Sequence, residues 1–594
     1  MIRRIPLVGS LIVCLVVCVS ISSPVTAAEK TAAELLPNTV AIYAELPQAK
    51  QLLATVLDHP LRPKLEALDD YRKAYQSPQY AQLQIGVAIV EQKLGMKWRP
   101  AIEALTDGGI YFAVDVKTQG AITLVKAKDA AMLEKFRDTI IQLARDDAAA
   151  KGNPDPVKSV DYRGHMAYQI GEGRFATLGS WLVLTNKGET GKALLDAYVD
   201  GNPQSLASDE AFITARKTIS GQPTIWSFVR LNVLRDAGIA KELFAGKTDN
   251  PAAELLVGGI MATLQKTPYA TASLDASKER LALSLSVPFE SSWVDSTRHF
   301  YFGPDGNSPA PRLLSTKDTL LSLSTYRDLA GLWAASADLF NEQVNAQIAQ
   351  ANSGLSPLFS GKDFGTDVLG SVRPEIQLVV ARQTFAADTP TPSIKLPALA
   401  FAFRLKEPDK MQRQWKVTFQ SLLGFLNVLG AMQGQPQLEM NNEKVDGVLL
   451  VTGAYLPKDG DAPDKATAIT YNLAPTAAFV NDLFIVSSSR QLALDLGKAA
   501  QQPAENPTAS TTNTHLLLNV APIREALADN VSHLVSQNML EKGHDKAHAE
   551  KEISALLAVL GVLRDASLKL TSEAKTLRLE LDVRLAAEAA GGTK

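Results

Sequence analysis

The same order of sequence elements occurs twice in this chain, and this repetition constrains the fold more than any other feature. Each half opens with paired leucines and an apolar strand, at residues 40–46 and 319–325. Each half closes with an apolar helix and a hairpin, whose last strands carry leucine or valine at every second position in 281–287 and 577–583. Because the order holds through roughly eight elements, we interpret the chain as an old internal duplication with insertions.

The spacing of apolar residues predicts the fold class. Period-two alternation is typical of a strand with one buried and one exposed face, and amphipathic helices separate many of these strands. We therefore predict an α+β fold with two tandem related domains, each a mainly antiparallel sheet with helices packed on one side. Repeat A spans 28–290 and repeat B spans 313–588. Residues 291–312, rich in Gly and Pro, are predicted to be a linker, and 589–594 a disordered tail.

The N-terminus has the pattern of an export signal. Two arginines precede an apolar run at 11–21, and small residues follow. We predict that residues 1–27 are a signal peptide, with cleavage after Ala27 or Ala28. The run is shorter than the about 20 apolar residues that a retained membrane anchor needs. The mature protein is then expected in the periplasm, in the cell envelope or outside the cell, with no membrane span.

Both cysteines of the chain, Cys14 and Cys18, lie inside this signal. Each follows a valine, where lipid attachment needs a small residue, so a lipoprotein is disfavoured. The mature chain is predicted to lack thiol chemistry, which excludes disulfides, zinc–thiolate sites and cysteine nucleophiles.

Composition excludes several classes of protein. The 594 residues are 46% hydrophobic and 21% charged, with a net charge of −3. Cleavage removes two arginines, which leaves 58 Lys and Arg against 63 Asp and Glu in the mature chain. These values fit an ordinary folded protein and disfavour collagen, a disordered chain and a nucleic-acid binder.

Motifs that carry chemistry are scarce. The glycine-rich stretch 171–176 is followed by apparent strands instead of a helix N-terminus, so a hairpin turn is favoured over a dinucleotide site. Ser572 and Lys575 have the spacing of a nucleophile and its base, but they lie in a hydrophilic turn. No phosphate loop, zinc-protease helix or nucleophile elbow occurs. The sequence therefore predicts no catalytic residue and no cofactor.

Two segments are weak candidates for a metal site. His544 and His548 are four residues apart on an expected helix, with Glu541 and Glu552 nearby, a spacing from which a surface metal ion could be bound. Because 541–552 is almost wholly hydrophilic, a solvated helix face is favoured. The second candidate is an acidic loop that contains Asp459, Asp461 and Asp464, but these residues lack the spacing of a calcium-binding loop. No metal site is predicted.

Aromatic and apolar clusters remain. The His-Phe-Tyr-Phe run at 299–302 is expected to pack the two halves together, with a binding patch as the alternative. Segments 255–264, 419–432 and 555–563 are too short to span a membrane and are expected to be buried helices. The segment 419–432 is also a candidate for contact with an apolar ligand.

The opening Leu35-Leu36-Pro37-Asn38-Thr39, followed by a strand and a Leu-rich helix ending at His59-Pro60, carries a family resemblance. It resembles a family of exported bacterial proteins of unknown function, common in planctomycete-type bacteria, with long α+β repeats. The match covers about 25 residues directly, and the second half lacks the proline at Leu313-Leu314-Ser315. The resemblance implies export and supplies no catalytic residues.

The leading hypothesis is therefore an exported, non-catalytic binding or scaffolding module whose partner is an unknown protein or envelope component. A carrier of lipid or another apolar ligand is the first alternative. A hydrolase with a site assembled from distant residues is the second, since catalytic triads are spatial and not sequential.

Overall fold

The computed structural model describes residues 30–66, 69–244, 246, 248–385, 391–434, 436–455, 468–503, 511–573 and 575–586. The predicted signal peptide, the acidic loop at 458–465 and the predicted tail at 589–594 lie outside these residues.

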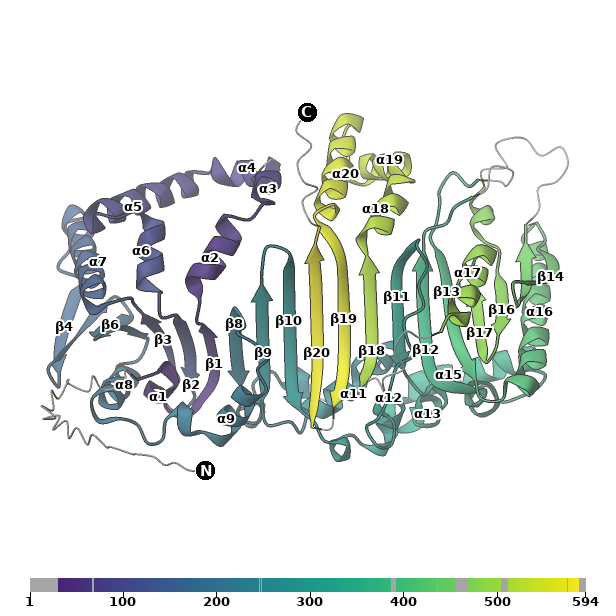
Figure 1. The fold of residues 1–594 in the computed structure, drawn as a ribbon, viewed down its shortest axis with the longest axis horizontal. Coiled ribbons are helices and arrows are strands. Elements are labelled where there is room, and N and C mark those ends of the chain that lie inside the picture. Colours follow the sequence, from purple (N-terminus) through teal and green to yellow (C-terminus); the bar gives the residue numbers. More distant parts are fainter. Residues whose placement is uncertain are drawn as a thin grey trace, which may run out of the picture.

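Twenty described strands form one continuous antiparallel sheet, which together with the helices confirms the α+β class (Figure 1). In the first half the strand order is β4-β5-β6-β7-β3-β2-β1-β8-β9-β10. The strands are β1 (Val40–Leu46), β2 (Ile110–Asp115), β3 (Gly120–Lys126), β4 (Val157–Tyr162), β5 (His165–Ile170), β6 (Gly173–Leu178), β7 (Trp181–Thr185), β8 (Ile225–Val229), β9 (Ala270–Ala276) and β10 (Arg280–Pro288).

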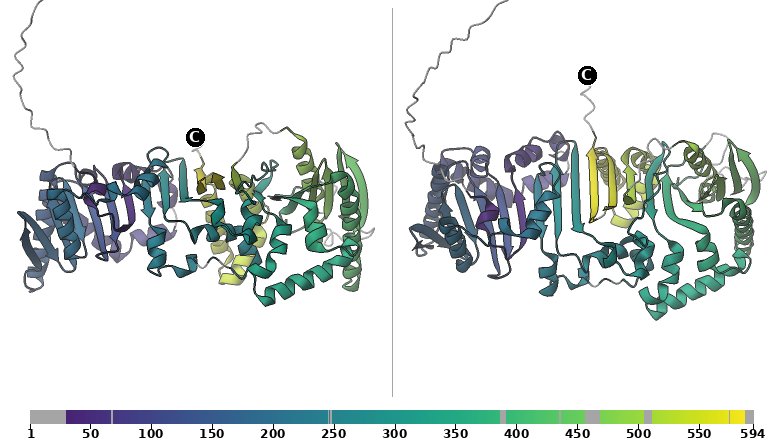
Figure 2. Two further views of the ribbon diagram at one scale, coloured as in Figure 1. Left: turned by 90° about the horizontal axis from the view of Figure 1, so that it is seen from below. Right: turned by 60° about the horizontal axis from the view of Figure 1, so that its bottom comes forward.

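The second half has the same order, β14-β15-β16-β17-β13-β12-β11-β18-β19-β20. Strands β10 and β20 pair with each other and join the halves (Figure 2). The strands are β11 (Thr319–Tyr326), β12 (Val372–Ala381), β13 (Ala398–Leu405), β14 (Glu439–Val445), β15 (Val448–Ala454), β16 (Thr476–Val480), β17 (Leu483–Ser487), β18 (Thr512–Asn519), β19 (Leu563–Glu573) and β20 (Thr576–Leu585).

Side chains of each strand alternate between two faces of this sheet. The pairing register places Tyr43, Ser284 and Glu580 on one face, which we call the front, and the other face we call the back. On the front, α1 (Ala32–Leu35), α8 (Gly188–Asp200) and α9 (Glu210–Lys217) cover the first half, and α17 (Arg490–Gln501) covers the second.

Other helices cover parts of the back, so the prediction that helices pack on only one side of each sheet is wrong. At the two ends of the back lie α6 (Trp98–Leu105) with α7 (Ala130–Ala150), and α16 (Pro408–Met432). At the centre, α11 (Pro251–Leu264), α12 (His299–Phe302), α14 (Ser336–Leu339) and α15 (Glu342–Leu355) supply a third packed cluster. The remaining helices are α2 (Ala49–Leu57), α3 (Arg62–Glu66), α4 (Asp69–Tyr75), α5 (Pro78–Leu94), α10 (Leu231–Asp236), α13 (Leu329–Ala334), α18 (Val520–Ala528), α19 (Val531–Lys542) and α20 (Lys546–Leu560).

The segment between the halves is packed into the core. Phe300, Tyr301 and Phe302 are at most 2% exposed and lie in one cluster with residues from both halves. Gly259 of α11 allows this approach, because a Cβ there would lie 2.4 Å from the Tyr301 ring. The aromatic run thus packs the halves together, as expected from the sequence. Short helical turns precede Gly303, where the Gly and Pro content predicted an irregular linker.

A buried arginine also joins the halves. The Arg327 guanidinium lies 3.5 Å from the centre of the Tyr301 ring. It donates hydrogen bonds to the Leu255 carbonyl oxygen at 2.6 Å and to Asn513 Oδ1 at 2.8 Å. Burial lowers the pKa of Arg327. Leu255 belongs to the first half and Asn513 to the second, so one side chain fixes both.

The prediction that the three apolar segments are buried helices is partly wrong. Helix α16 buries Phe419 and Leu423, but Val428 is 60% and Met432 80% exposed. Leu256 of α11 and Leu556 of α20 are also exposed. These segments are apolar around more than one helix face, and each helix has only one face packed against the protein.

Candidate binding faces of the central sheet

The two final hairpins meet at the centre of the sheet. Strand β10 pairs with β20 over its whole length, from Arg280 opposite Arg584 to Pro288 opposite Thr576. The sequence alignment of the two hairpins makes Ser284 and Glu580 equivalent positions, and these two residues lie directly opposite each other. The halves therefore meet about an approximate two-fold axis. The front and back of this junction differ sharply in chemistry.

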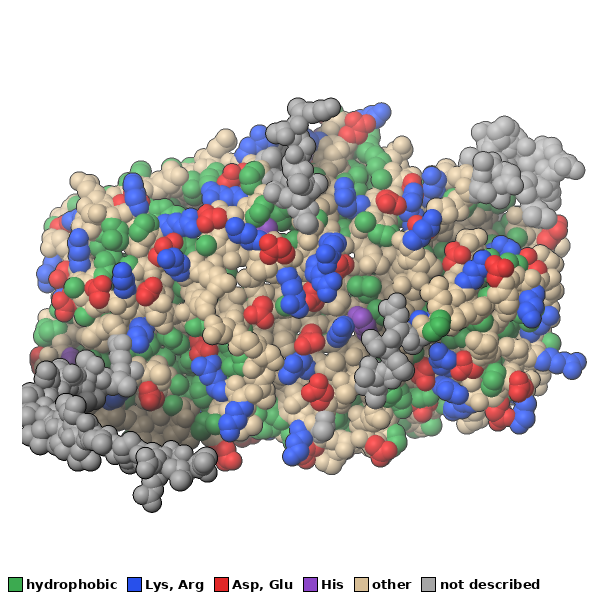
Figure 3. Space-filling model, viewed as in Figure 1, with side chains coloured by type: hydrophobic (Ala, Val, Ile, Leu, Met, Phe, Trp, Pro, Cys, Tyr) green, Lys and Arg blue, Asp and Glu red, His purple; other side chains and the backbone are tan. Residues whose placement is uncertain are grey.

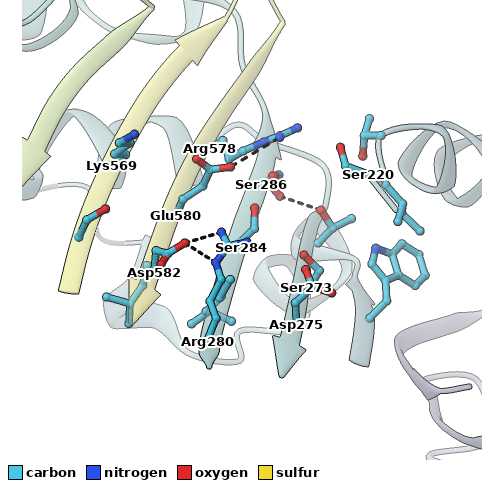
Figure 4. A pocket seen from close by; sticks show the side chains of 18 of the residues that line it. Ser220, Ser273, Asp275, Arg280, Ser284, Ser286, Lys569, Arg578, Glu580 and Asp582 are labelled. Carbon is cyan, nitrogen blue, oxygen red and sulfur yellow. Dashed lines mark hydrogen bonds and ion pairs between the residues drawn. The ribbon is translucent and has the colours of Figure 1, made fainter. Parts of the chain in front are cut away.

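The front of the junction is polar. Figure 3 shows Lys, Arg, Asp and Glu side chains mixed over the central strands of this face. An open pocket of about 310 Å³ lies here, between α9 and the junction. Its lining is rich in hydroxyl and charged side chains, among them Ser273, Asp275, Arg280, Ser284, Ser286, Lys569, Arg578, Glu580 and Asp582 (Figure 4).

Most of these charges neutralise one another. Arg280 Nε donates to Asp582 Oδ2 at 2.6 Å across the junction, and this hydrogen bond raises the pKa of Arg280. Arg584 Nε lies 3.4 Å from Asp582 Oδ1. Arg578 and Glu580 form a looser pair at 3.8 Å. The positive and negative charges in the pocket thus nearly cancel, so the pocket suits a ligand that forms hydrogen bonds better than a strongly charged ligand.

His515 of β18 lies beside this array. It is directly opposite Lys569 of β19 in the sheet, and both side chains point to the front. Burial, and secondarily the Lys569 ammonium, lower the pKa of His515 to about 4. The imidazole is therefore neutral at physiological pH.

The back of the junction is aliphatic. Directly opposed residues of successive strands form two rows on this face. The first row is Leu274, Leu283, Leu581, Leu568, Leu516, Leu323, Leu378 and Phe401. The second row is Leu281, Val583, Ala566, Leu518, Leu321, Val380 and Leu399. We call these two rows the leucine face.

The leucine face is largely open. Leu281 is 42% exposed, Leu581 38% and Phe401 40%, and the other members are half-buried or, like Leu399, exposed. None of them belongs to a packed core cluster. Monomeric soluble proteins rarely leave a large contiguous apolar patch open without a binding role. This face is therefore the strongest candidate binding surface in the described part of the chain.

The structure places the residues singled out in the sequence as follows. Residues 171 and 172 form the turn between β5 and β6, so the glycine-rich stretch is a hairpin, as expected. Ser572 lies within β19 and not in the turn as predicted, and its hydroxyl donates to the Gly306 carbonyl oxygen at 3.3 Å. Lys575 lies in the following turn.

The histidine prediction needs one correction. His544 lies in the connection before α20 and not on the helix itself, because α19 ends at Lys542 and Gly543 adopts a left-handed conformation. The connection nevertheless brings His544, His548 and Glu552 together, with one ligand atom of each within 4.8 Å of the others. Hydrogen bonds from Lys542 and Asn538 lower the pKa of Glu552 to about 2.

Sequence reasoning missed the polar pocket and the leucine face. The period-two pattern of 281–287 and 577–583 identified the apolar face, but the prediction that this face is buried is wrong at Leu281 and Leu581, which are 42% and 38% exposed. Nothing in that pattern indicated that the two strands pair with each other or that the face stays open. The pattern predicts an exposed polar face, but it does not indicate that Arg280 and Asp582 pair across the junction.

Comparisons with known proteins add little. No family model and no curated protein matches the chain. Crystal form I of TP0453 is 10% identical, with 48% of this chain and 88% of that chain covered and a TM-score of 0.25. Crystal form III is 9% identical, with 44% and 80% covered and a TM-score of 0.24. Likeness at this level carries no argument about function.

The helices of the described residues were also compared with the requirements for crossing a bilayer. None of them combines the necessary length and apolarity.

Proposed function

We propose that this protein is an exported binding protein that holds an apolar ligand, of the acyl-chain type, on the leucine face without converting it. The observation that carries the proposal is the open aliphatic surface at the junction of the halves. Fifteen side chains form it, and they come from the eight neighbouring strands β9, β10, β20, β19, β18, β11, β12 and β13. Neither row contains a charged residue.

The chemistry of the rows favours acyl chains over other occupants. Every member is aliphatic except Phe401, so the surface offers dispersion contacts and apolar burial but no side-chain hydrogen bond. Strands are spaced about 4.8 Å apart, so the eight strands of the first row span roughly 34 Å. Such a long, featureless apolar surface suits extended flexible chains. A protein partner usually presents polar groups around its apolar contacts.

Export and internal duplication are part of the same proposal. Export rests on the arginines, apolar run and small residues at the N-terminus, and N-terminal sequencing of the protein from its native host tests it. Duplication is supported by the identical pairing order of the ten strands in each half. In this view, duplication created the leucine face, because each half contributes its final hairpin to it.

The direct test is native mass spectrometry of the exported protein, purified gently and without detergent. We expect an additional mass that organic extraction releases as a fatty acid or phospholipid. We also expect the stripped protein to bind a fluorescent fatty acid saturably. A bare mass together with no saturable binding would overturn the proposal, as would a co-purifying protein seated on this face.

Matched variants locate the ligand. Leu281→Thr combined with Leu581→Thr introduces β-branched residues that suit a strand but removes apolar surface from the leucine face. We expect fatty-acid affinity to fall at least tenfold. Glu580→Thr is the control, because it lies next to Leu581 and points to the front. Equal loss in both variants would show that the leucine face is not the site.

A further inference from the structure

We propose that His544, His548 and Glu552 form a binding site for one divalent transition-metal ion of the Zn²⁺, Ni²⁺ or Co²⁺ type. The site lies at the α19–α20 connection, above β18–β20 in Figure 1, and none of its three residues belongs to the leucine face. It is independent of the proposed apolar ligand.

The geometry of the three side chains carries the inference. The rings of His544 and His548 are 4.3 Å apart between centroids. His548 Nε2 lies 3.5 Å from Glu552 Oε1, and His544 Nδ1 lies 3.7 Å from Glu552 Oε2. The ligand atoms of a bound metal ion lie about 3–3.5 Å apart when each bond is about 2.0–2.2 Å. Small rotations therefore suffice to close the site.

Two different elements deliver these ligands, and their packing fixes them. His548 and Glu552 are one helical turn apart on α20, so they share a face. His544 reaches the same face from the connection. Helices α19 and α20 pack through Val535, Ala549 and Ile553, which gives the site a firm base instead of a single flexible helix.

The donor set selects the class of metal. Two imidazole nitrogens and one carboxylate oxygen suit Zn²⁺ and neighbouring transition metals, whereas Ca²⁺ and Mg²⁺ prefer oxygen ligands alone. Three protein ligands leave a further coordination position for water. The side chains of His544, His548 and Glu552 are 28%, 56% and 35% exposed, so an ion can reach them from solvent.

Lys542 pairs with the carboxylate that the metal ion would use. Its Nζ lies 2.8 Å from Glu552 Oε2, and Asn538 Nδ2 donates to the same oxygen at 2.7 Å. A bound metal ion at Glu552 repels the Lys542 ammonium. Lys542 is 54% exposed, so it can swing into solvent. The structure thus predicts that Lys542 competes with the metal and weakens its binding.

The test is titration calorimetry with Zn²⁺ on the chain beginning at residue 28, without an added histidine tag. We expect one saturable Zn²⁺ per chain. His544→Ala and His548→Ala should each weaken binding at least tenfold, and Lys542→Met should tighten it by about twofold to tenfold. His533→Ala is the matched control, because His533 is an exposed histidine of α19 outside the cluster.

Circular dichroism of each variant separates loss of a ligand from loss of the fold. Visible absorption of a Co²⁺ complex gives a second readout of nitrogen and oxygen coordination. The proposal is overturned if the wild-type protein shows no saturable Zn²⁺ binding, or if His533→Ala weakens binding as much as His544→Ala. Equal affinity for Ca²⁺ would also overturn it.

Discussion

Two parts of the back of the sheet carry leucines, but the leucines of one part are buried and those of the other are exposed. On the back of the central hairpins, Leu570 and Leu577 are only 3% exposed, because α12 and its neighbours cover them. Two to four residues further along the paired strands, Leu581 and Leu281 are 38% and 42% exposed. The comparison teaches that alternating leucines define a face, while the docking of distant helices decides whether that face becomes core.

The largest expected effect comes from removing the cover. Phe302 is 1% exposed and its ring lies 5.1 Å from that of Phe289. Phe302→Ala should lower the free energy of unfolding by about 3–5 kcal/mol, since it leaves a cavity in a packed cluster. Urea denaturation measures this effect.

Leu581→Ala is the comparison within the same face. It should lower the free energy of unfolding by only about 1 kcal/mol, because the Leu581 side chain stays partly in contact with water in the folded protein. Equal losses in the two variants would contradict the division of the back face into a covered and an open part.

The next largest effect concerns a buried ion pair among the covering helices. Arg298 Nε lies 2.5 Å from Glu254 Oε1, with side-chain exposures of 7% and 1%. Glu254→Gln should lower the free energy of unfolding by about 3 kcal/mol, because it leaves a buried guanidinium without its counter-charge.

The exposed pair Lys410–Glu407 supplies the control for this variant. Glu407→Gln should change stability by less than about 0.5 kcal/mol in the same denaturation experiment. A small effect of Glu254→Gln would mean that water reaches this ion pair and that the helices around it are not tightly packed.

A pH effect tests the front of the junction. The folded protein holds the pKa of His515 at about 4, mainly through burial, whereas an unfolded histidine titrates near about 6.5. As pH falls from about 6.5 to 4, His515 takes up a proton in the unfolded chain before it does so in the folded protein. The free energy of unfolding therefore decreases over that pH range.

His515→Gln should remove this contribution to the pH dependence. The measurement is the difference in the free energy of unfolding between pH 7.5 and pH 4.5, in the wild type and in the variant. We expect a smaller loss in the variant. Identical losses would show that His515 titrates normally and that the front face around it is well hydrated.

The smallest effect is expected in the polar pocket. Arg280 pairs with Asp582 across the junction, but the Arg280 side chain is 56% exposed. Arg280→Gln should lower the free energy of unfolding by only about 0–1 kcal/mol. A double-mutant cycle with Asp582→Asn isolates the pair. A larger coupling would mean that the ion pairs, and not only the backbone ladder, hold β10 to β20.

Much of the fold followed from the sequence, and much of the candidate sites did not. The strands at 40–46, 281–287 and 577–583 were predictable because a pleated strand imposes period-two alternation locally. The openness of Phe401 and Leu581 was not predictable, since it depends on which helices dock elsewhere. The position of His544 was mistaken because Gly543 ends α19 and starts a new connection.

The sequence by itself determined the order of elements, the apolar and polar sides of each strand, and the lack of local catalytic motifs. These are properties of neighbouring residues, which short-range geometry controls. The tertiary structure alone decided that β10 pairs with β20, that leucines from both halves share one open face, and that two histidines meet a glutamate. Such encounters depend on how distant segments pack, and the hydrophobic effect that drives packing has no directional preference.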